Sequence, residues 1–560
     1  MFSGAKVRKF AKMTNVLKND LSLPVYNQKT HAMRVKMLLF LLLCNLFVAA
    51  QTIEVSGLQA GIWDADTVKV TGDVVVEDAL GILPGTVVLF EGFYHISVEK
   101  DATLTANGTE NDSILFTVSD TTGFYLFNSG RGGWNGIRID RAENARFDYC
   151  RMQYGKAALD DDQDGGALRI YDCDNVAINN SVLFCNFSRE HGGALNAERS
   201  KVVIRDCDID HNLTYTGLDT VYYMYGGGLR FINCDVELVG TAFLYNNGVG
   251  AIGGALSLDS CSVNIDRCRF EHNYGINGGG LYLIRSGHKT CSISNTLFAN
   301  NTSGHFGGGL AISDSSPEIS NLTVVNNHSI GVNCGGIFFY QYSAPIVRNC
   351  IVYGNTNSAP LEEPVQMWTW TFDDYAPKFF NCLVQYGFDN ISNNEVIHVY
   401  EDCLDTDPLF IAPDDEDFHV NNESPCVDAG SPETPQVILD GTDLDGRWRL
   451  CGSRVDIGAY EFSGEGVQEL SQETGLCIVG NPVTAMSYVE WHLDNSAVVT
   501  LSIFTFDGRQ VRQKALGTCP AGDHRYAIGT LFQDLADGPY LLVVSTPTRS
   551  WTGKVIQSKH

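Results

Sequence analysis

Short segments in which apolar and polar residues alternate recur along most of the chain. Typical examples are residues 168–170, 202–204 and 263–265, and Gly, Asn, Asp and Ser stand between such segments. Alternation with turn residues on both sides predicts β-strands, and these segments lack the apolar spacing of a helix. Strands this short cannot bury a face by themselves. We therefore expect them to stack on one another.

A glycine pair followed by an apolar residue marks one point of a repeat. The apolar residue is taken as Leu168, Leu195, Leu229, Leu256, Leu281, Leu310 and Phe338, which gives successive differences of 27, 34, 27, 25, 29 and 28 residues. An asparagine marks a second point and keeps the same register, at Asn186, Asn212, Asn246, Asn273, Asn301, Asn327 and Asn355. Two markers in step show an internal repeat, which has to be recognised before a fold is inferred.

The period of the repeat selects the fold. Coils of about 27 residues leave room for three short strands, and stacking at about 4.8 Å lets each coil satisfy the backbone groups of the next. A leucine-rich repeat would need a helical half, which the pattern lacks. The sequence therefore predicts an all-β protein, with a parallel β-helix of three strands per coil over residues 52–400.

The glycine units alternate with segments such as Cys207–Asn212 and Cys268–Asn273. In this combination the chain resembles the right-handed parallel β-helix proteins of pectate-lyase-like fold, and among them the glycine-rich surface β-helices of bacteria. The resemblance implies the right-handed fold and leaves the activity open, because unrelated functions share one fold.

The chain changes character after residue 400. Residues 401–462 resemble the choice-of-anchor segment that follows many bacterial β-helices, and we expect this segment to cap the open end of the coil stack. A polar linker is expected at 463–475, followed by a small β-sandwich at 476–560. This last module resembles the C-terminal sorting domain of the type IX secretion system, which implies that its machinery is a partner. The matching positions are Asn481, Pro482, Gly508, Gly538, Tyr540 and Lys554.

The N-terminus indicates export. Residues 1–32 are polar and basic, which suggests a misassigned start or a disordered extension, although a genuine N-terminal extension is the alternative. From Met33, the basic residues Arg34 and Lys36 precede an apolar stretch at 37–48 and a small-residue cleavage site. Residues 33–50 therefore read as a signal peptide. We expect a protein secreted or held at the outer membrane or cell surface of a Gram-negative bacterium, with no transmembrane segment in the mature chain.

The net charge limits the kinds of ligand the protein can bind, and the cysteine spacing indicates how the interior is packed. Asp and Glu total 66 against 38 Lys and Arg, a formal net charge of −28, which argues against nucleic acid as a ligand. It also disfavours a bare polyuronate unless a divalent cation lies between. Sixteen cysteines follow Cys44, and many recur at coil spacing, which favours two buried columns of thiols. One column holds Cys173, Ser200, Cys234, Cys261 and Cys291, and a Cys234–Cys261 disulfide is the alternative.

Three places could carry chemistry. Asp160, Asp162 and Asp164 alternate before Gly165 as in a calcium loop, although a solvated acidic turn also explains them. No other cofactor is indicated. Asp161, Asp162, Glu190 and His191 fall on neighbouring coils and are candidates for acid–base catalysis. A row of outward positions, one residue after each apolar marker, could bind a glycan or form an ordinary solvated face; its main members are Arg169, Asn196, Arg230, Tyr282 and Phe339.

Three functions stay open at this point. We favour an exported β-helix protein that binds glycans or other surface partners, in an adhesive or structural role. A polysaccharide lyase or glycoside hydrolase on the same scaffold is the alternative, and a passive spacer is the third. No lyase or hydrolase motif matches residue by residue.

Overall fold

A computed structural model describes residues 51–557, apart from 160–162, 216–223, 288, 332, 359–364, 463–475, 480–482, 484–486, 494, 506–508, 537 and 548. The expected extension at 1–32, the signal peptide at 33–50 and the linker at 463–475 therefore lie outside the described residues. Within the described part, no helix combines the length and the apolar character needed to cross a membrane.

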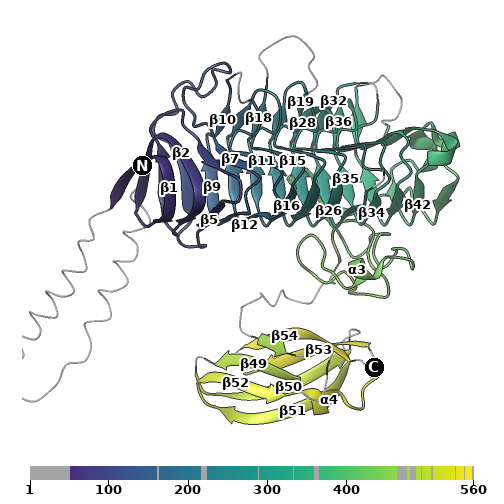
Figure 1. The fold of residues 1–560 in the computed structure, drawn as a ribbon. Coiled ribbons are helices and arrows are strands. Elements are labelled where there is room, and N and C mark those ends of the chain that lie inside the picture. Colours follow the sequence, from purple (N-terminus) through teal and green to yellow (C-terminus); the bar gives the residue numbers. More distant parts are fainter. Residues whose placement is uncertain are drawn as a thin grey trace, which may run out of the picture. The chain divides into compact units, whose positions relative to one another are not determined.

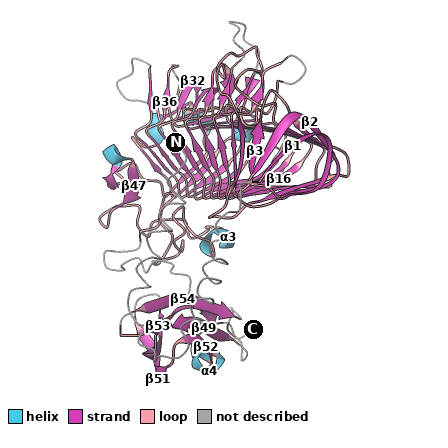
Figure 2. Cartoon of the chain, turned by 90° about the vertical axis from the view of Figure 1, so that its left-hand side faces the viewer, coloured by secondary structure: helices cyan, strands magenta, loops and turns pink. Residues whose placement is uncertain are grey.

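The described chain from residue 52 to about 404 winds into a right-handed β-helix whose strands pair in parallel from coil to coil (Figures 1 and 2). Each full coil contributes three strands to one continuous sheet, as the period of the repeat predicted. A short fourth strand forms a separate narrow sheet. The three columns of the main sheet are called here the first, second and third columns.

In the repeated coils the first column begins just after the glycine pair. Its strands are β4 (Ile96–Val98), β7 (Ile137–Asp140), β11 (Leu168–Tyr171), β15 (Leu195–Glu198), β20 (Leu229–Ile232), β25 (Leu256–Asp259), β29 (Leu281–Ile284), β33 (Leu310–Ser313), β37 (Ile337–Gln341), β41 (Met367–Thr371) and β44 (Ile391–Ser392).

The second column follows on the next side of the coil. Its strands are β5 (Thr103–Asn107), β8 (Asn144–Asp148), β12 (Val176–Asn179), β16 (Lys201–Arg205), β21 (Asp235–Val239), β26 (Ser262–Asp266), β30 (Cys291–Ser294), β34 (Glu318–Ser320), β38 (Ile346–Arg348), β42 (Lys378–Phe380) and β45 (Val399–Glu401).

The third column ends just before the repeated asparagine. Its strands are β3 (Val87–Phe90), β6 (Ile114–Val118), β9 (Cys150–Gln153), β13 (Val182–Phe184), β17 (Asp208–Asp210), β22 (Ala242–Leu244), β27 (Arg269–Glu271), β31 (Leu297–Ala299), β35 (Thr323–Val325), β39 (Ile351–Tyr353) and β43 (Leu383–Val384). The narrow sheet after the asparagine holds β10 (Lys156–Ala157), β14 (Phe187–Ser188), β18 (Leu213–Thr214), β23 (Asn247–Gly248), β28 (Tyr274–Asn277), β32 (Thr302–Phe306), β36 (His328–Ser329) and β40 (Thr356–Asn357).

Two long strands open the stack. β1 (Thr52–Trp63) pairs with β2 (Thr67–Ile82), and β2 pairs in turn with β3, β4 and β5, so one strand meets all three columns. Elsewhere β19 (Met224–Tyr225) and β24 (Ala251–Ile252) form a small parallel pair just before the glycines of their coils. Four 3₁₀ turns lie near the far end: η1 (Asp373–Tyr375), η2 (Phe388–Asn390), η3 (Asn394–Val396) and η4 (Pro413–Asp415).

The repeated asparagines form a buried ladder. In Asn273, Nδ2 donates to Asn301 Oδ1 at 2.9 Å and to the Phe243 carbonyl at 2.8 Å, while its Oδ1 accepts from the Asn246 backbone and side-chain nitrogens. The same bonds run from Asn186 to Asn355, where Gln366 receives the last of them. An aliphatic side chain at these positions would leave buried backbone groups without partners.

The cysteines pack inside the coil as small buried side chains. The Cys234 amide donates to Cys261 Sγ at 3.4 Å, and the Cys261 amide donates to Ser286 Oγ at 3.0 Å. Both thiols are free. The column therefore continues through Ser286, and the placement of Cys291 in it was wrong, because Cys291 pairs with Val263 in the second column. An insertion before Cys291 makes its spacing misleading.

The segment after the last coil packs along the side of the β-helix, where we had expected it over the open end. It contains the antiparallel pair β46 (Phe410–Ala412) and β47 (Asp417–Val420) and the short helix α3 (Gln436–Leu439). Its Phe418 packs against Leu297 and Val325 in the third column. The Ala459 amide donates to Thr323 Oγ1 at 2.9 Å, and Asn349 bonds the backbone amide of Ser431.

The last module forms its own core from antiparallel strands, which fits a β-sandwich. One sheet holds β48 (Leu476–Val479), β49 (Tyr488–Leu493) and β52 (Gly522–Ala527), and the other holds β50 (Ala497–Thr505), β51 (Gln510–Cys519), β53 (Gly538–Ser545) and β54 (Ser550–Gln557), with α4 (Gly529–Phe532) between β52 and β53 in the chain. Of the sorting positions, Gly538 and Tyr540 lie on β53 and Lys554 on β54, whereas Asn481, Pro482 and Gly508 fall outside the described residues.

Candidate functional site on the first column

The outward positions of the first column form a row, called here the outer strip. Strand register aligns Arg138, Arg169, Asn196, Arg230, Ser257, Tyr282, Ala311, Phe338 and Trp368. Much of this row is shielded from solvent, because Asn196 is 2%, Arg230 9% and Ser257 0% exposed. The outer strip is therefore not an ordinary solvated face.

Phe339 does not belong to the outer strip, and its assignment was wrong. Leu310 pairs with Ile337, so Phe338 takes the outward position and Phe339 lies fully buried in the core. Three glycines precede Leu310, whereas only Gly335 and Gly336 precede Ile337. The step from Leu310 to its partner Ile337 is therefore one residue shorter than the step between the first glycines of the two coils. Both Ile337 and Phe338 are apolar, so the sequence did not show which of them is the inward residue after the glycine pair.

The middle of the outer strip carries charge. Arg230 Nη1 donates to Asn196 Oδ1 at 3.0 Å and lies 3.3 Å from a Glu198 carboxylate oxygen, and the guanidinium lies 5.8 Å from the Tyr225 ring centroid. Next along the strip, Ser257 Oγ is buried and has no hydrogen-bond partner among the described residues. A buried hydroxyl without a partner costs free energy that the rest of the fold has to offset.

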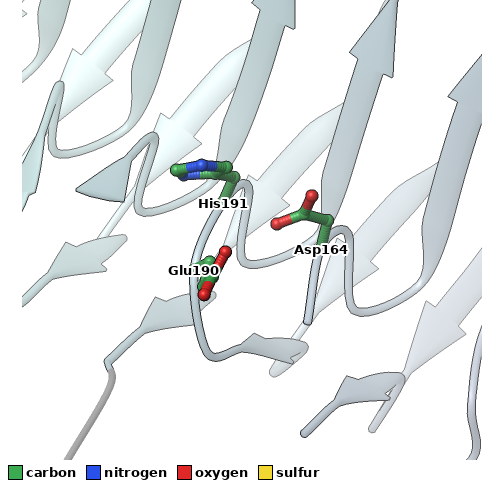
Figure 3. A group of neighbouring side chains, drawn as sticks. All are labelled: Asp164, Glu190 and His191. Atoms are coloured by element: carbon green, nitrogen blue, oxygen red, sulfur yellow. The ribbon is translucent and has the colours of Figure 1, made fainter. Parts of the chain in front are cut away.

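Beside the charged part of the strip, three side chains on two neighbouring coils gather at one point. Asp164 and His191 are paired across the coils by one isolated parallel bridge, and Glu190 precedes His191 in the chain. One donor atom from each of the three lies within 4.8 Å of the other two. Figure 3 shows them together, with Asp164 on one coil and the other two on the next.

The surroundings of His191 keep it uncharged. Burial, reinforced by the positive charge of Arg230, lowers the pKa of the imidazole to about 3. The Tyr225 amide donates to His191 Nδ1 at 3.3 Å, and the Tyr225 ring lies 5.6 Å from the His191 ring between centroids. The structure thus unites Glu190 and His191 of the proposed catalytic set with Asp164 of the proposed calcium set. Asp160, Asp161 and Asp162 lie outside the described residues.

The far end of the outer strip is aromatic. On β37 and β41 the outward positions pair Phe338 with Trp368 and Tyr340 with Trp370, and Tyr342 and Phe372 follow the two strands. Trp370 is 54%, Phe372 57% and Tyr342 49% exposed. Tyr342 contacts the Phe372 ring at 5.3 Å and the Tyr375 ring at 5.1 Å between centroids. We call Tyr340, Tyr342, Trp370, Phe372 and Tyr375 the aromatic platform.

The sequence analysis missed the aromatic platform. Its signal was the alternation in residues 367–372, Met-Trp-Thr-Trp-Thr-Phe, which places every aromatic side chain on one face of a strand. The segment lies beyond the last glycine pair, so the repeat markers did not point to it.

A hollow lies over the second column, away from these residues. It has a volume of about 660 Å³ and is lined by backbone and side chains that include Arg146, Asp174, Lys201 and Arg205. Arg146 pairs with Asp148 and Arg205 pairs with Glu237, so most of its charge is already balanced within the protein.

Comparison with protein families agrees with this architecture. A family model described as "Right handed beta helix region" matches residues 116–321 and 253–399, together just over half of the chain. The chain belongs to the right-handed β-helix family. A search of curated proteins gave no match to this β-helix protein. The family assignment establishes the fold and names no reaction or ligand.

Proposed function

We propose that this β-helix protein is exported and binds glycans along the outer strip, with the aromatic platform as its main contact. The platform carries the proposal. Exposed aromatic side chains that adjoin one another mark a site of interaction more often than isolated ones. Here Trp370 lies on β41 and Tyr342 and Phe372 follow β37 and β41, and each exposes about half of its surface.

The chemistry of the strip fits a sugar chain. Aromatic rings offer a flat apolar surface on which the C–H face of a pyranose can lie, and the polar groups nearby can bond its hydroxyls. Arg169 and Tyr282 are half-buried in the same row and carry such groups, whereas Asn196, Arg230 and Ser257 are shielded from solvent. The net charge of −28 favours a neutral glycan over a polyanionic one.

A polysaccharide panel tests this proposal. The protein is applied to immobilised neutral and acidic polysaccharides, and we expect saturable binding to at least one neutral member. Replacing Trp370 or Tyr342 with Ala should weaken that binding about tenfold or more, since central aromatic contacts dominate interfaces. Tyr245→Ala is the matched control, because Tyr245 is also 49% exposed but lies at the corner after the third column. Equal affinity of all variants would reject the platform.

A lyase or hydrolase is the second candidate, and the grouping of Asp164, Glu190 and His191 next to Arg230 favours it. Carboxylates beside a neutral imidazole are suited to proton transfer at a glycosidic bond or at a sugar carbon. The same panel decides between the two candidates: new reducing or unsaturated ends, lost in Glu190→Gln, indicate an enzyme, and binding without new ends indicates a binder.

Export is part of the proposal. The apolar segment at 37–48 after Arg34 and Lys36 has the composition of a signal peptide. The C-terminal module has a core of its own, which suits an address that is read by the type IX secretion machinery separately from the β-helix. We infer a location at the outer membrane or cell surface, or in the medium, of a Gram-negative bacterium.

A further inference from the structure

We propose that Asp164, Glu190 and His191 form a binding site for one divalent transition-metal cation. The three donor atoms come from two adjacent coils and lie within 4.8 Å of one another (Figure 3). A cation with carboxylate and imidazole ligands sits about 2.0–2.2 Å from each donor. Two donors on one ion are therefore at most about 4.4 Å apart, so the three atoms have to move closer together, and His191 has either to give up the Nδ1 hydrogen bond from the Tyr225 amide or to turn its other ring nitrogen to the ion.

The backbone beneath the three side chains is firmly held. The Gly165 amide donates to the His191 carbonyl at 2.9 Å, and the Gly192 amide donates to the Tyr225 carbonyl at 2.9 Å. The Glu190 amide donates to the Gln163 carbonyl at 3.1 Å. Each of these bonds joins one coil to the next, so the relative positions of the ligand-bearing backbones are fixed before any ion binds. Such preorganisation lowers the entropic cost of assembling the site.

The donor set selects the class of metal. Imidazole suits Zn²⁺ and the other first-row divalent ions, whereas Ca²⁺ takes oxygen ligands almost exclusively. Two carboxylates with one imidazole therefore favour a transition metal over the calcium ion expected from the aspartates at 160, 162 and 164. Arg230 brings a positive charge near His191, but it is paired with Glu198 at 3.3 Å. Part of the Arg230 charge is therefore balanced within the protein before any cation binds.

Other histidines beside carboxylates differ from this group. In His419 both ring nitrogens are already bonded, Nδ1 to Asp417 at 2.6 Å and Nε2 to Asp445 at 2.7 Å, which is the arrangement of an imidazolium between two carboxylates. His211 bonds one carboxylate, Asp210, at 2.5 Å. Among the described residues, only Asp164, Glu190 and His191 bring three such donors together.

Cobalt(II) is a suitable probe, because the chain contains 17 cysteines that could bind zinc on their own. The metal-stripped full-length protein, kept reduced, is dialysed against Co²⁺, and its metal content and absorption spectrum are recorded. We expect about one Co²⁺ per chain, with weak visible bands and without the strong near-ultraviolet absorption of cobalt–thiolate bonds. A thiolate spectrum, or no stoichiometric uptake, would overturn the proposal.

Variants locate the ion. Asp164→Asn, Glu190→Gln and His191→Asn should each reduce the bound Co²⁺ at least tenfold at sub-stoichiometric metal. The matched control is the double variant Asp210→Asn with His211→Asn, which removes a carboxylate–imidazole pair elsewhere and should bind as the parent does. Far-ultraviolet circular dichroism confirms that each variant is folded. Undiminished binding by all three site variants would refute the assignment.

Two further measurements separate this site from the other proposals. Calcium in tenfold excess should leave Co²⁺ in place, and its displacement would show an oxygen-ligand site instead. The inference is independent of glycan binding: Trp370→Ala should bind Co²⁺ fully even where it loses affinity for polysaccharide. Failure of one proposal therefore leaves the other to be judged on its own result.

Discussion

At the scale of single residues, the asparagine ladder makes the clearest demand on the sequence. Replacing Asn273 with Leu removes four hydrogen bonds and leaves the Asn246 amide and the Phe243 carbonyl without this partner inside the coil. We expect the free energy of unfolding of the β-helix to fall by about 3 kcal/mol or more. Urea unfolding followed by fluorescence measures the loss.

Asn264→Ala is the control for the ladder. Asn264 lies on the exposed face of β26 and bonds Ser292 at 2.8 Å. Its removal should change stability by no more than about 0.5 kcal/mol, as is usual for surface positions. Similar losses of unfolding free energy for Asn264→Ala and Asn273→Leu would show that the buried ladder bonds contribute no more to stability than a surface hydrogen bond.

Sequence alone predicted which residue types stack, and failed where a coil changes length. The asparagines were correctly placed, because an insertion rarely falls between a turn residue and the strand it ends. Phe339 and Cys291 were misplaced, because a missing glycine in one case and an inserted loop in the other shifted the count. Asp164 and His191 each precede the first glycine of a pair and stand 27 residues apart, so the repeat already aligned them, but the calcium-loop pattern assigned Asp164 to a different set of ligands.

At the scale of elements, the segment from residue 404 to 462 should make stability depend on pH through His419. Asp445 and Asp417 raise the pKa of His419. A raised histidine pKa contributes stability that is complete below about 6.5 and is lost as the pH rises through the folded-state value. His419 also lowers the pKa of Asp445, so the same pair weakens again in strong acid.

His419→Gln tests this dependence. Thermal melting between pH 5 and pH 8 should show the parent losing more stability than the variant as the pH rises. Burial raises the pKa of Asp456 to about 6 and that of Glu461 to about 9, and both shifts also cost stability with rising pH. The comparison therefore rests on the difference between the two slopes. Parallel slopes would exclude His419 as a contributor.

The position of this segment could not be read from its sequence. An uncovered last coil exposes strand edges, which suggested a lid over the end. The structure instead uses Phe418 and Ala459 to cover small and apolar side chains of the third column, such as Ala299 and Thr323. In the sequence those outward positions resemble ordinary strand residues. Packing of another segment against the side of the β-helix does not change the period of the repeat.

At the scale of the whole molecule, we expect removal of residues 481–560 to leave the β-helix folded and to prevent its transport to the cell surface. The C-terminal strands have their own core, so the truncated β-helix should keep its melting temperature. If the module is a sorting address, the truncated protein accumulates in the periplasm, which cell fractionation and surface proteolysis detect. Normal surface amounts of the truncated protein would contradict the sorting role, and full-length protein in the cytoplasm would contradict both export signals.

The β-helix itself was predictable, because a repeat of short strands has few ways to bury its apolar residues. Its ligand was not. Outward side chains are free of the packing rules that make the interior periodic, so the chemistry of the aromatic platform does not follow from the period.

The stacking of coils also determines how the protein would respond to mechanical force. Each internal coil holds its neighbours through rows of backbone bonds and one rung of the asparagine ladder. Tension applied to the chain would break the bonds of one terminal coil before it loaded the next. Each coil of about 27 residues would release roughly 90 Å of chain. If the protein is held at one end while force acts on the other, it would extend in repeated steps of nearly equal length, and each step would absorb mechanical work.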